Sequence, residues 1–202
     1  MRSISPKNRT AKLDQNLFNQ IKQVMVKQIL FSGHMIDAPN REVPRFPAHH
    51  EKHVKKALGK ILSKLQLAEI PQGICSAAAG GDILFLEHCK DLGIPTKIFL
   101  PTEPAEFRKE SVDFAGKDWP ERFNRMLEHS PVFVLDPSIH KTTKNIYTLT
   151  NEWMIEQALQ SPTEQILLIA LWNGKKGDGG GGTWEMVEKC RQVGIKVEHL
   201  QP

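Results

Sequence analysis

The chain has 202 residues, of which 40% are hydrophobic and 25% are charged, and its formal net charge is +4. This length suits one sizeable domain, and the composition is that of an ordinary globular protein. The basic excess is too mild for a nucleic-acid signature, and it suits anionic small molecules as well as polyanions.

The start of the chain and its cysteines bear on where the protein works. Residues 1–15 lack the apolar core of a signal peptide, and no segment approaches about 18 uninterrupted apolar residues. We therefore expect a cytoplasmic protein without a membrane partner. Cys75, Cys89 and Cys190 are widely spaced and form no CxxC pair, so we expect reduced thiols packed as small apolar groups.

Six short apolar runs are the expected strands. In chain order they are KQILFS (27–32), GICSA (73–77), TKIFL (96–100), VFVLD (132–136), QILLIAL (165–171) and the weaker KVEHL (196–200). Short, nearly continuous apolar runs rich in Ile, Val and Phe are typical of strands buried on both faces of a parallel sheet. Residues 1–20 are polar and indicate a tail or an edge helix, and residues 21–202 are predicted to form a single domain.

Helical patterns fill the intervals between these runs. Apolar residues recur at helical spacing in 47–67, 80–93, 119–129 and 151–160. Gly93 suits a left-handed cap, and Pro120 fits only a first turn. Strand and helix alternating about five times predict right-handed crossovers. The expected fold is an open, mainly parallel, Rossmann-like α/β sheet of five or six strands with helices on both faces.

Ligands of such a sheet bind beyond the carboxyl ends of the strands. The first run is followed there by FSGHMID, in which Ser32 and Gly33 offer backbone N–H groups. His34 and Asp37 offer side chains for a sugar or a base. The alternative is that Ser32 and Gly33 only turn the chain and that His34 is a solvated or core histidine.

The second run leads into SAAAGGDILFLEHC, where Gly80, Gly81 and Asp82 open a helix. Small residues leave N–H groups uncovered at the positive end of the helix dipole, which favours a phosphate. An equally weighted alternative is that Asp82 caps the helix while the glycines allow close helix–sheet packing. The segment lacks the dinucleotide fingerprint GxGxxG.

The fifth run leads into NGKKGDGGGGTWEMVEKC, residues 173–190, which holds six of the chain's fourteen glycines. Glycine lets backbone donors approach an anion without a Cβ in the way, and a ligand can offset the entropy lost in ordering the loop. We therefore expect Gly180, Gly182 and Thr183 to hold a phosphate or diphosphate at the start of an amphipathic helix. The alternative is a disordered solvent loop.

Two further candidates depend on isolated side chains. Arg108 follows the third run, where it either pairs with a phosphate or belongs to a solvated helix face. His49 and His53 lie four residues apart on one helical face, but the HExxH order is missing and no Cys or carboxylate cluster completes a site. We predict no metal site and no cofactor.

These motifs resemble those of the Rossmann-like SLOG group, which includes the cytokinin-activating nucleotide phosphoribohydrolases and the DNA-processing protein DprA. The similarity is greatest to a bacterial subset, often attached to cyclase, TIR or repeat modules, that carries GHMIDAP…RFP, FRKESV…DWPERF and WNGKKGDGGGGT in this order. It covers residues 27–200. The resemblance implies a nucleotide-type ligand in a pocket floored by the two glycine loops.

The resemblance also bears on catalysis. The phosphoribohydrolase signature is PGGxGTxxE, and the matching residues here are Gly179, Gly180, Gly182 and Thr183. Asp178 stands where the proline would be, and Met186 falls on the carboxylate position. Glu185, one residue earlier, is offset on the helix by about 100 degrees.

We therefore expect a nucleotide-binding domain that acts as a signalling or sensor module. An alternative is an enzyme that hydrolyses an N-ribosyl bond, with Glu185 or Asp82 orienting the ribose or the water. A less favoured alternative is a DprA-like module on single-stranded DNA, which would need basic side chains interleaved with stacking aromatics. The expected partner is a nucleotide-type small molecule rather than nucleic acid, and a homo-oligomer is left open.

Overall fold

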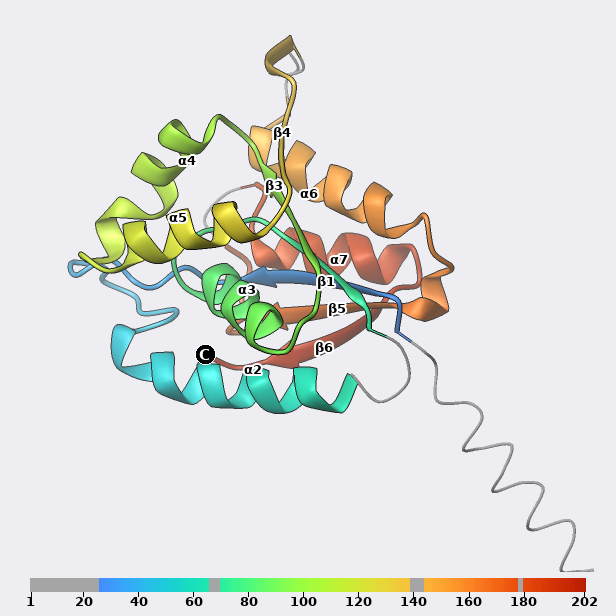
Figure 1. Ribbon diagram of the computed structural model, residues 1–202. Helices are drawn as coiled ribbons and strands as arrows, with labels where there is room; N and C mark the ends of the chain where they lie inside the picture. Colours follow the sequence, from blue (N-terminus) through green and yellow to red (C-terminus); the bar gives the residue numbers. More distant parts are fainter. Residues whose placement is uncertain (1–25, 66–69, 139–143, 178–179) are drawn as a thin grey trace, which may run out of the picture.

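Within the residues described, six parallel strands form one sheet in the order β4-β3-β2-β1-β5-β6. The computed structural model describes residues 26–65, 70–138, 144–177 and 180–202 (Figure 1). The strands are β1 (Gln28–Gly33), β2 (Gln72–Cys75), β3 (Thr96–Leu100), β4 (Val132–Val134), β5 (Ile166–Leu171) and β6 (Lys196–Leu200). The predicted open α/β sheet is confirmed, and every strand pair in it is parallel.

Helices connect these strands. The α-helices are α2 (Glu51–Leu65), α3 (Gly81–Asp91), α4 (Pro104–Ser111), α5 (Trp119–His129), α6 (Ile146–Ala158) and α7 (Thr183–Gln192). Short 3-10 turns are η1 (Ala48–His50), η2 (Asp113–Ala115) and η4 (Thr163–Gln165). As predicted, Pro120 lies in the first turn of α5, and Gly93, just beyond α3, has a positive φ of 68°.

The strand order contains one reversal. Strand β1 pairs with β2 on one side and with β5 on the other. The chain builds outward from β1 to β4 and then returns to place β5 on the opposite side of β1. Connections therefore leave β1 and β5 in opposite directions, and the carboxyl ends of these two strands flank a topological switch point. Open α/β sheets bind ligands at such points.

Helices cover both faces of the sheet, and each face has its own apolar core (Figure 1). Ile29 and Phe31 of β1 belong to the core that α2, α3 and α5 cover. Leu30 points to the opposite face and packs in the core that includes Met154 of α6 and Met186 of α7. This alternation follows from the two-residue period of a strand, and it explains why the strands appear in the sequence as continuous apolar runs.

Several strand and helix ends differ from the sequence predictions. Strand β2 ends at Cys75, and the next residue, Ser76, instead donates its hydroxyl to the carbonyl oxygen of Phe99 at 2.8 Å. Helix α6 begins five residues before the predicted start at 151, because the side chain of Asn145 accepts a hydrogen bond from the N–H of Tyr147 and caps the helix. The early start brings an additional turn of α6 to the sheet edge.

The cysteine prediction has a structural counterpart. Cys75, Cys89 and Cys190 are buried, unpaired thiols. None of the helices in the described part of the chain is long and apolar enough to cross a membrane. The same residues contain no group of three or more His, Cys, Asp or Glu side chains that could hold a metal ion. The predicted tail at 1–20 lies outside the described residues.

Candidate functional site

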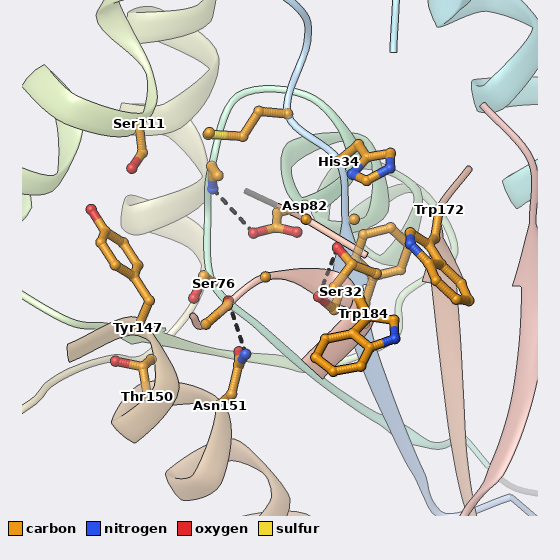
Figure 2. Close-up of a pocket in the computed structure, with 18 of the residues that line it drawn as sticks. Ser32, His34, Ser76, Asp82, Ser111, Tyr147, Thr150, Asn151, Trp172 and Trp184 are labelled. Carbon is orange, nitrogen blue, oxygen red and sulfur yellow. Dashed lines mark hydrogen bonds between the residues drawn. The ribbon is translucent and has the colours of Figure 1, made fainter. Parts of the chain in front are cut away.

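A cavity of about 330 Å³ lies at the topological switch point (Figure 2). Its walls come from the exits of β1, β2 and β5 and from α3, α4, α6 and α7. The loop between β5 and α7, called the glycine loop below, completes them with Lys175, Gly177 and 180–182. The polar and aromatic lining residues are Phe31, Ser32, His34, Arg45, Ser76, Asp82, Phe107, Glu110, Ser111, Tyr147, Thr150, Asn151, Trp172, Lys175, Thr183 and Trp184. The cavity therefore combines hydroxyl, carboxyl, amide, cationic and indole groups.

The structure gathers more than half of the predicted site residues around this cavity. Those that line it are Ser32, Gly33, His34, Asp82, Gly180, Gly182 and Thr183. Those that do not line it are Asp37, Gly80, Gly81, Arg108 and Glu185. Asp178 and Gly179 lie outside the described residues. Asp178 stands at the proline position of the phosphoribohydrolase signature, and Gly179 matches its first glycine.

The exit of β1 is tied to the exit of β5. The hydroxyl of Ser32 donates to Oγ1 of Thr183 at 3.3 Å, and Nε2 of His34 accepts from the N–H of Asn173 at 3.2 Å. Because Nε2 is an acceptor, the neutral imidazole carries its proton on Nδ1. Burial lowers the pKa of His34, which keeps the ring neutral near pH 7. His34 is thus a neutral polar group of the wall rather than a cation.

The glycine loop ends on the first turn of α7. Gly182 is the N-cap residue, Thr183 is the first helical residue, and no side chain caps this turn. The loop is held from two sides, since Asn151 of α6 donates to the carbonyl oxygen of Gly181 at 2.9 Å and Glu185 accepts from its N–H at 2.6 Å. Gly182 and Thr183 line the cavity, so the start of α7 borders the cavity without a side-chain cap.

Glu185 acts on the loop from outside the cavity lining. Besides the N–H of Gly181, its Oε2 accepts from the hydroxyl of Thr148 at 3.0 Å, and its Oε1 lies 3.1 Å from Nζ of Lys189. Burial opposes ionisation of this carboxyl, but the bonds from Gly181, Lys189 and Thr148 outweigh it and hold the pKa below its usual value. Glu185 is a charged anchor of the loop in this arrangement.

Asp82 stands in the middle of the cavity view in Figure 2. Only 6% of the residue is exposed, and its Oδ2 accepts from the N–H of Ala78 at 3.3 Å. Burial raises the pKa of Asp82 to about 7, against the opposing effect of hydrogen bonds from the backbone of Ala78 and Gly33. Asp82 therefore exchanges its proton close to neutral pH.

Asp37 shapes the cavity without lining it. Its carboxylate accepts from the N–H groups of Arg45 and Phe46 at 2.9 Å each and lies 3.4 Å from Nε of Arg41. These contacts fold the loop after β1 back on itself and bring Arg45 to the cavity wall.

Gly80 and Gly81, at the start of α3, also lie outside the lining of the cavity. Gly80 has a φ of 120°, and a Cβ there would stand 2.5 Å from the N atom of Ile36. A Cβ on Gly81 would stand 3.0 Å from Cα of Gly33. Both glycines therefore permit close packing between α3 and the exit of β1. Arg108 pairs with Asp113 at 3.2 Å on α4 and η2.

Sequence reasoning did not single out the α6 side of the cavity. Tyr147, Thr150 and Asn151 reach it from one face of that helix, and the hydroxyl of Tyr147 donates to Glu110 of α4 at 2.8 Å. The available signal was Asn145, a favoured N-cap residue that would have moved the helix start to include Tyr147. Ser76, Trp172 and Trp184 were also missed, although each directly follows a strand or begins a helix at the carboxyl edge.

Comparisons with known proteins add little beyond the fold. No family model matches the chain, and no curated protein does. DNA processing protein A (DprA) from Streptococcus pneumoniae has a TM-score of 0.49 at 12% identity, covering 87% of this chain and 50% of its own. The structural-genomics target TM1055 has a TM-score of 0.45 at 15% identity, covering 85% and 72%. SuiB from Streptococcus suis, bound to S-adenosylmethionine, has a TM-score of 0.33 at 11% identity, covering 100% and 46%.

This chain thus spans half the length of DprA. All three TM-scores are below 0.5, so we draw no functional argument from these likenesses. The class of protein is instead defined by the sheet itself, whose parallel strands, central β1 and reversal at β5 make the chain a Rossmann-like α/β domain.

Proposed function

We propose that this chain is a nucleotide-binding or nucleotide-derivative-binding domain that works as a signalling or sensor module. The proposal depends on the cavity at the switch point. The first turn of α7, which no side chain caps, borders this cavity next to the exit of β1. Its volume of about 330 Å³ falls in the range of small-molecule sites.

The phosphate end of the ligand is assigned to the glycine loop and α7. Gly180, Gly182 and Thr183 line the cavity, and the first turn of the helix supplies N–H donors at the positive end of its dipole. Lys175 and Arg45 add positive charge to the same wall. Charge and backbone donors therefore favour an anion here.

The base is assigned to the indole side of the cavity. Trp172 and Trp184 stand together on one side of the view in Figure 2, next to Ser32. Large aromatic surfaces provide apolar contact area and stacking for a planar ring. Nζ of Lys176 lies 4.7 Å from the ring centroid of Trp184, a cation–π contact that adds positive charge next to this indole.

A thermal-shift screen tests the proposal. The protein is mixed with nucleoside mono-, di- and triphosphates, cyclic nucleotides, NAD and ADP-ribose, and each sample is analysed for released base. At a ligand concentration about a hundredfold above Kd, we expect the melting temperature to rise by about 5 to 10 °C. Failure of every nucleotide to shift the transition would contradict nucleotide binding.

Hydrolysis of an N-ribosyl bond is a second candidate, and Asp82 favours it. A buried carboxyl with a pKa of about 7 suits a general acid that protonates a leaving base. Released base in the screen would support an enzyme. Loss of turnover in Asp82→Asn with unchanged turnover in Glu185→Gln would assign the chemistry to Asp82, and the reverse pattern would assign it to Glu185, the other residue that the sequence offers.

A further inference from the structure

Asp82 differs from the other polar side chains of the cavity in its spare hydrogen-bonding capacity. Most of the others have a partner within the protein, as Ser32 has in Thr183 and Asn151 has in Gly181. The carboxylate of Asp82 accepts only from the backbone, from Ala78 and Gly33, among the bonds that the described residues show. A carboxylate offers about four acceptor positions. Asp82 can therefore accept further hydrogen bonds from a ligand.

The charges around Asp82 are distributed unevenly. The titratable and charged groups that share the cavity are His34, Arg45, Glu110, Tyr147 and Lys175, and the thiol of Cys75 lies buried nearby. The hydroxyl of Tyr147 donates a hydrogen bond to Glu110, and His34 is neutral. The structure shows no ion pair between Asp82 and any of the Lys or Arg residues it describes. In its ionised form, Asp82 would repel a phosphate placed against it, because no cation is paired with it among the described residues.

We propose that Asp82 is a specificity-determining residue, which accepts hydrogen bonds from an uncharged donor group of the ligand and directs the phosphate away from itself toward α7. The donor group is a sugar hydroxyl or an amino group of the base, since both present N–H or O–H to a carboxylate. The inference rests on the proposed nucleotide-binding function. It assigns an orientation, with the donor group at Asp82 and the phosphate at Gly182, Thr183 and the cationic wall.

Proton release accompanies such binding. Burial raises the pKa of Asp82 to about 7, and hydrogen-bond donors from a ligand would stabilise its ionised carboxylate. A fraction of the protein therefore holds this proton at neutral pH and must lose it when a donor binds. A phosphate bound at the same place would have the opposite effect and would favour proton uptake.

Calorimetric titration with AMP, 2′,3′-dideoxy-AMP and purine riboside 5′-monophosphate tests the assignment. The dideoxy nucleotide lacks the sugar hydroxyls, and the purine nucleotide lacks the amino group without adding another donor, so the two nucleotides distinguish the two donors. We expect the wild type to bind one of them about tenfold more weakly than AMP, which is the usual effect of a hydrogen bond to a charged group. Titrations of AMP near neutral pH in two buffers of different ionisation enthalpy count the protons released.

Asp82→Asn is the decisive variant, and Asp91→Asn is its matched control, because Asp91 is an exposed residue at the end of the same helix. We expect Asp82→Asn to bind AMP about tenfold more weakly, to lose the discrimination among the three nucleotides and to release fewer protons than the wild type. Asp91→Asn should match the wild type in all three respects.

Three results would overturn the inference. Equal wild-type affinity for all three nucleotides would show that neither donor is recognised, and this result does not depend on the folding of any variant. Tighter binding of AMP by Asp82→Asn would place the phosphate at Asp82. A wild type that does not bind AMP would also end the inference, whereas the nucleotide screen decides separately whether the proposed function fails.

Discussion

Gly181 and Gly194 have nearly the same backbone conformation but different surroundings. Their φ angles are 80° and 83°, which L side chains rarely adopt. A Cβ on Gly181 would overlap Cβ of Tyr147, whereas a Cβ on Gly194 would meet nothing within 4 Å. The two positions therefore separate the cost of the backbone conformation from the cost of displacing the glycine loop.

We predict that Gly194→Ala lowers the free energy of unfolding by about 1 kcal/mol and leaves nucleotide affinity unchanged. Gly181→Ala carries the same backbone cost and also pushes the loop away from α6, so nucleotide affinity should fall at least about tenfold, since a displaced loop no longer presents its donors. Denaturant unfolding and thermal shift with nucleotide measure both effects. Equal affinities in the two variants would show that the loop does not contact the ligand.

Asp82 makes the stability of the protein depend on pH. Burial raises its pKa from 3.8 to about 7, so between these values the folded protein holds a proton that the unfolded chain has released. The resulting stabilisation is complete below about pH 4 and is lost as the pH rises to about 7. Asp82→Asn should therefore gain stability relative to the wild type over this window, by up to about 4 kcal/mol.

Denaturant unfolding of the wild type, Asp82→Asn and Asp91→Asn at several pH values checks this prediction. The difference between Asp82→Asn and the wild type isolates Asp82 from the other titrating groups, such as His34, whose lowered pKa gives stability the opposite pH dependence. Asp91→Asn should track the wild type. A stability difference for Asp82→Asn that stays constant from pH 4 to pH 8 would contradict a titrating buried carboxyl.

At the scale of elements, Arg122 connects the three helices α2, α3 and α5. Its guanidinium on α5 donates to Glu87 of α3 at 2.7 and 2.9 Å and to Glu51 of α2 at 2.9 Å, and it lies 3.8 Å from the ring centroid of Trp119. Only 8% of the Arg122 side chain is exposed. The planar fork matches the Glu87 carboxylate in a way that an ammonium group cannot.

We predict that Arg122→Lys lowers the free energy of unfolding by about 2 kcal/mol, the usual loss for hydrogen bonds between charged partners. Arg125→Lys is the control on the same helix, where Arg125 is 54% exposed and lies 4.0 Å from Glu121. That substitution should change stability by less than about 0.5 kcal/mol. Denaturant unfolding compares the two, and equal losses would show that the buried network contributes no more than a surface pair.

Element positions could be predicted from the sequence, but the walls of the cavity only in part. Buried parallel strands leave continuous apolar runs, so the predicted runs overlap all the described strands, and Ser32 and Thr183 follow as residues at strand exits. A run of residues does not reveal which helix crosses the carboxyl edge, so Tyr147 and Asn151 of α6 were missed. The sequence likewise did not reveal the contact between Glu185 and Gly181, because only the folded loop brings the carboxylate to the N–H of Gly181.

At the scale of the whole molecule, the cavity joins parts of the chain that pack in different cores. Phe31 and Phe107 belong to the core on one face of the sheet, while Met154 and Trp172 belong to the core on the other. A ligand at the switch point would therefore contact both layers. Binding there should raise the stability of both faces together, and the gain should grow with the logarithm of the ligand concentration above Kd.

The salt dependence of binding distinguishes the nucleotide from the single-stranded DNA alternative. A mononucleotide displaces few counterions, so its affinity should fall only about two- to fivefold between low and physiological salt. A DNA-binding module would instead bind oligonucleotides with affinity that falls by orders of magnitude over the same range. Fluorescence anisotropy with labelled AMP and a labelled oligonucleotide measures both, and steep salt dependence with no AMP binding would favour DNA.

The central claim is that a nucleotide binds in the cavity between the exits of β1 and β5. The most direct test is a titration of ¹⁵N-labelled protein with AMP, followed by the backbone amide shifts in two-dimensional NMR spectra. We predict that the largest shifts occur at Ser32, Gly33 and the segment 180–184, which line the cavity or begin α7. No shifts, or shifts confined to the exposed lysine-bearing side of α2, would contradict the claim.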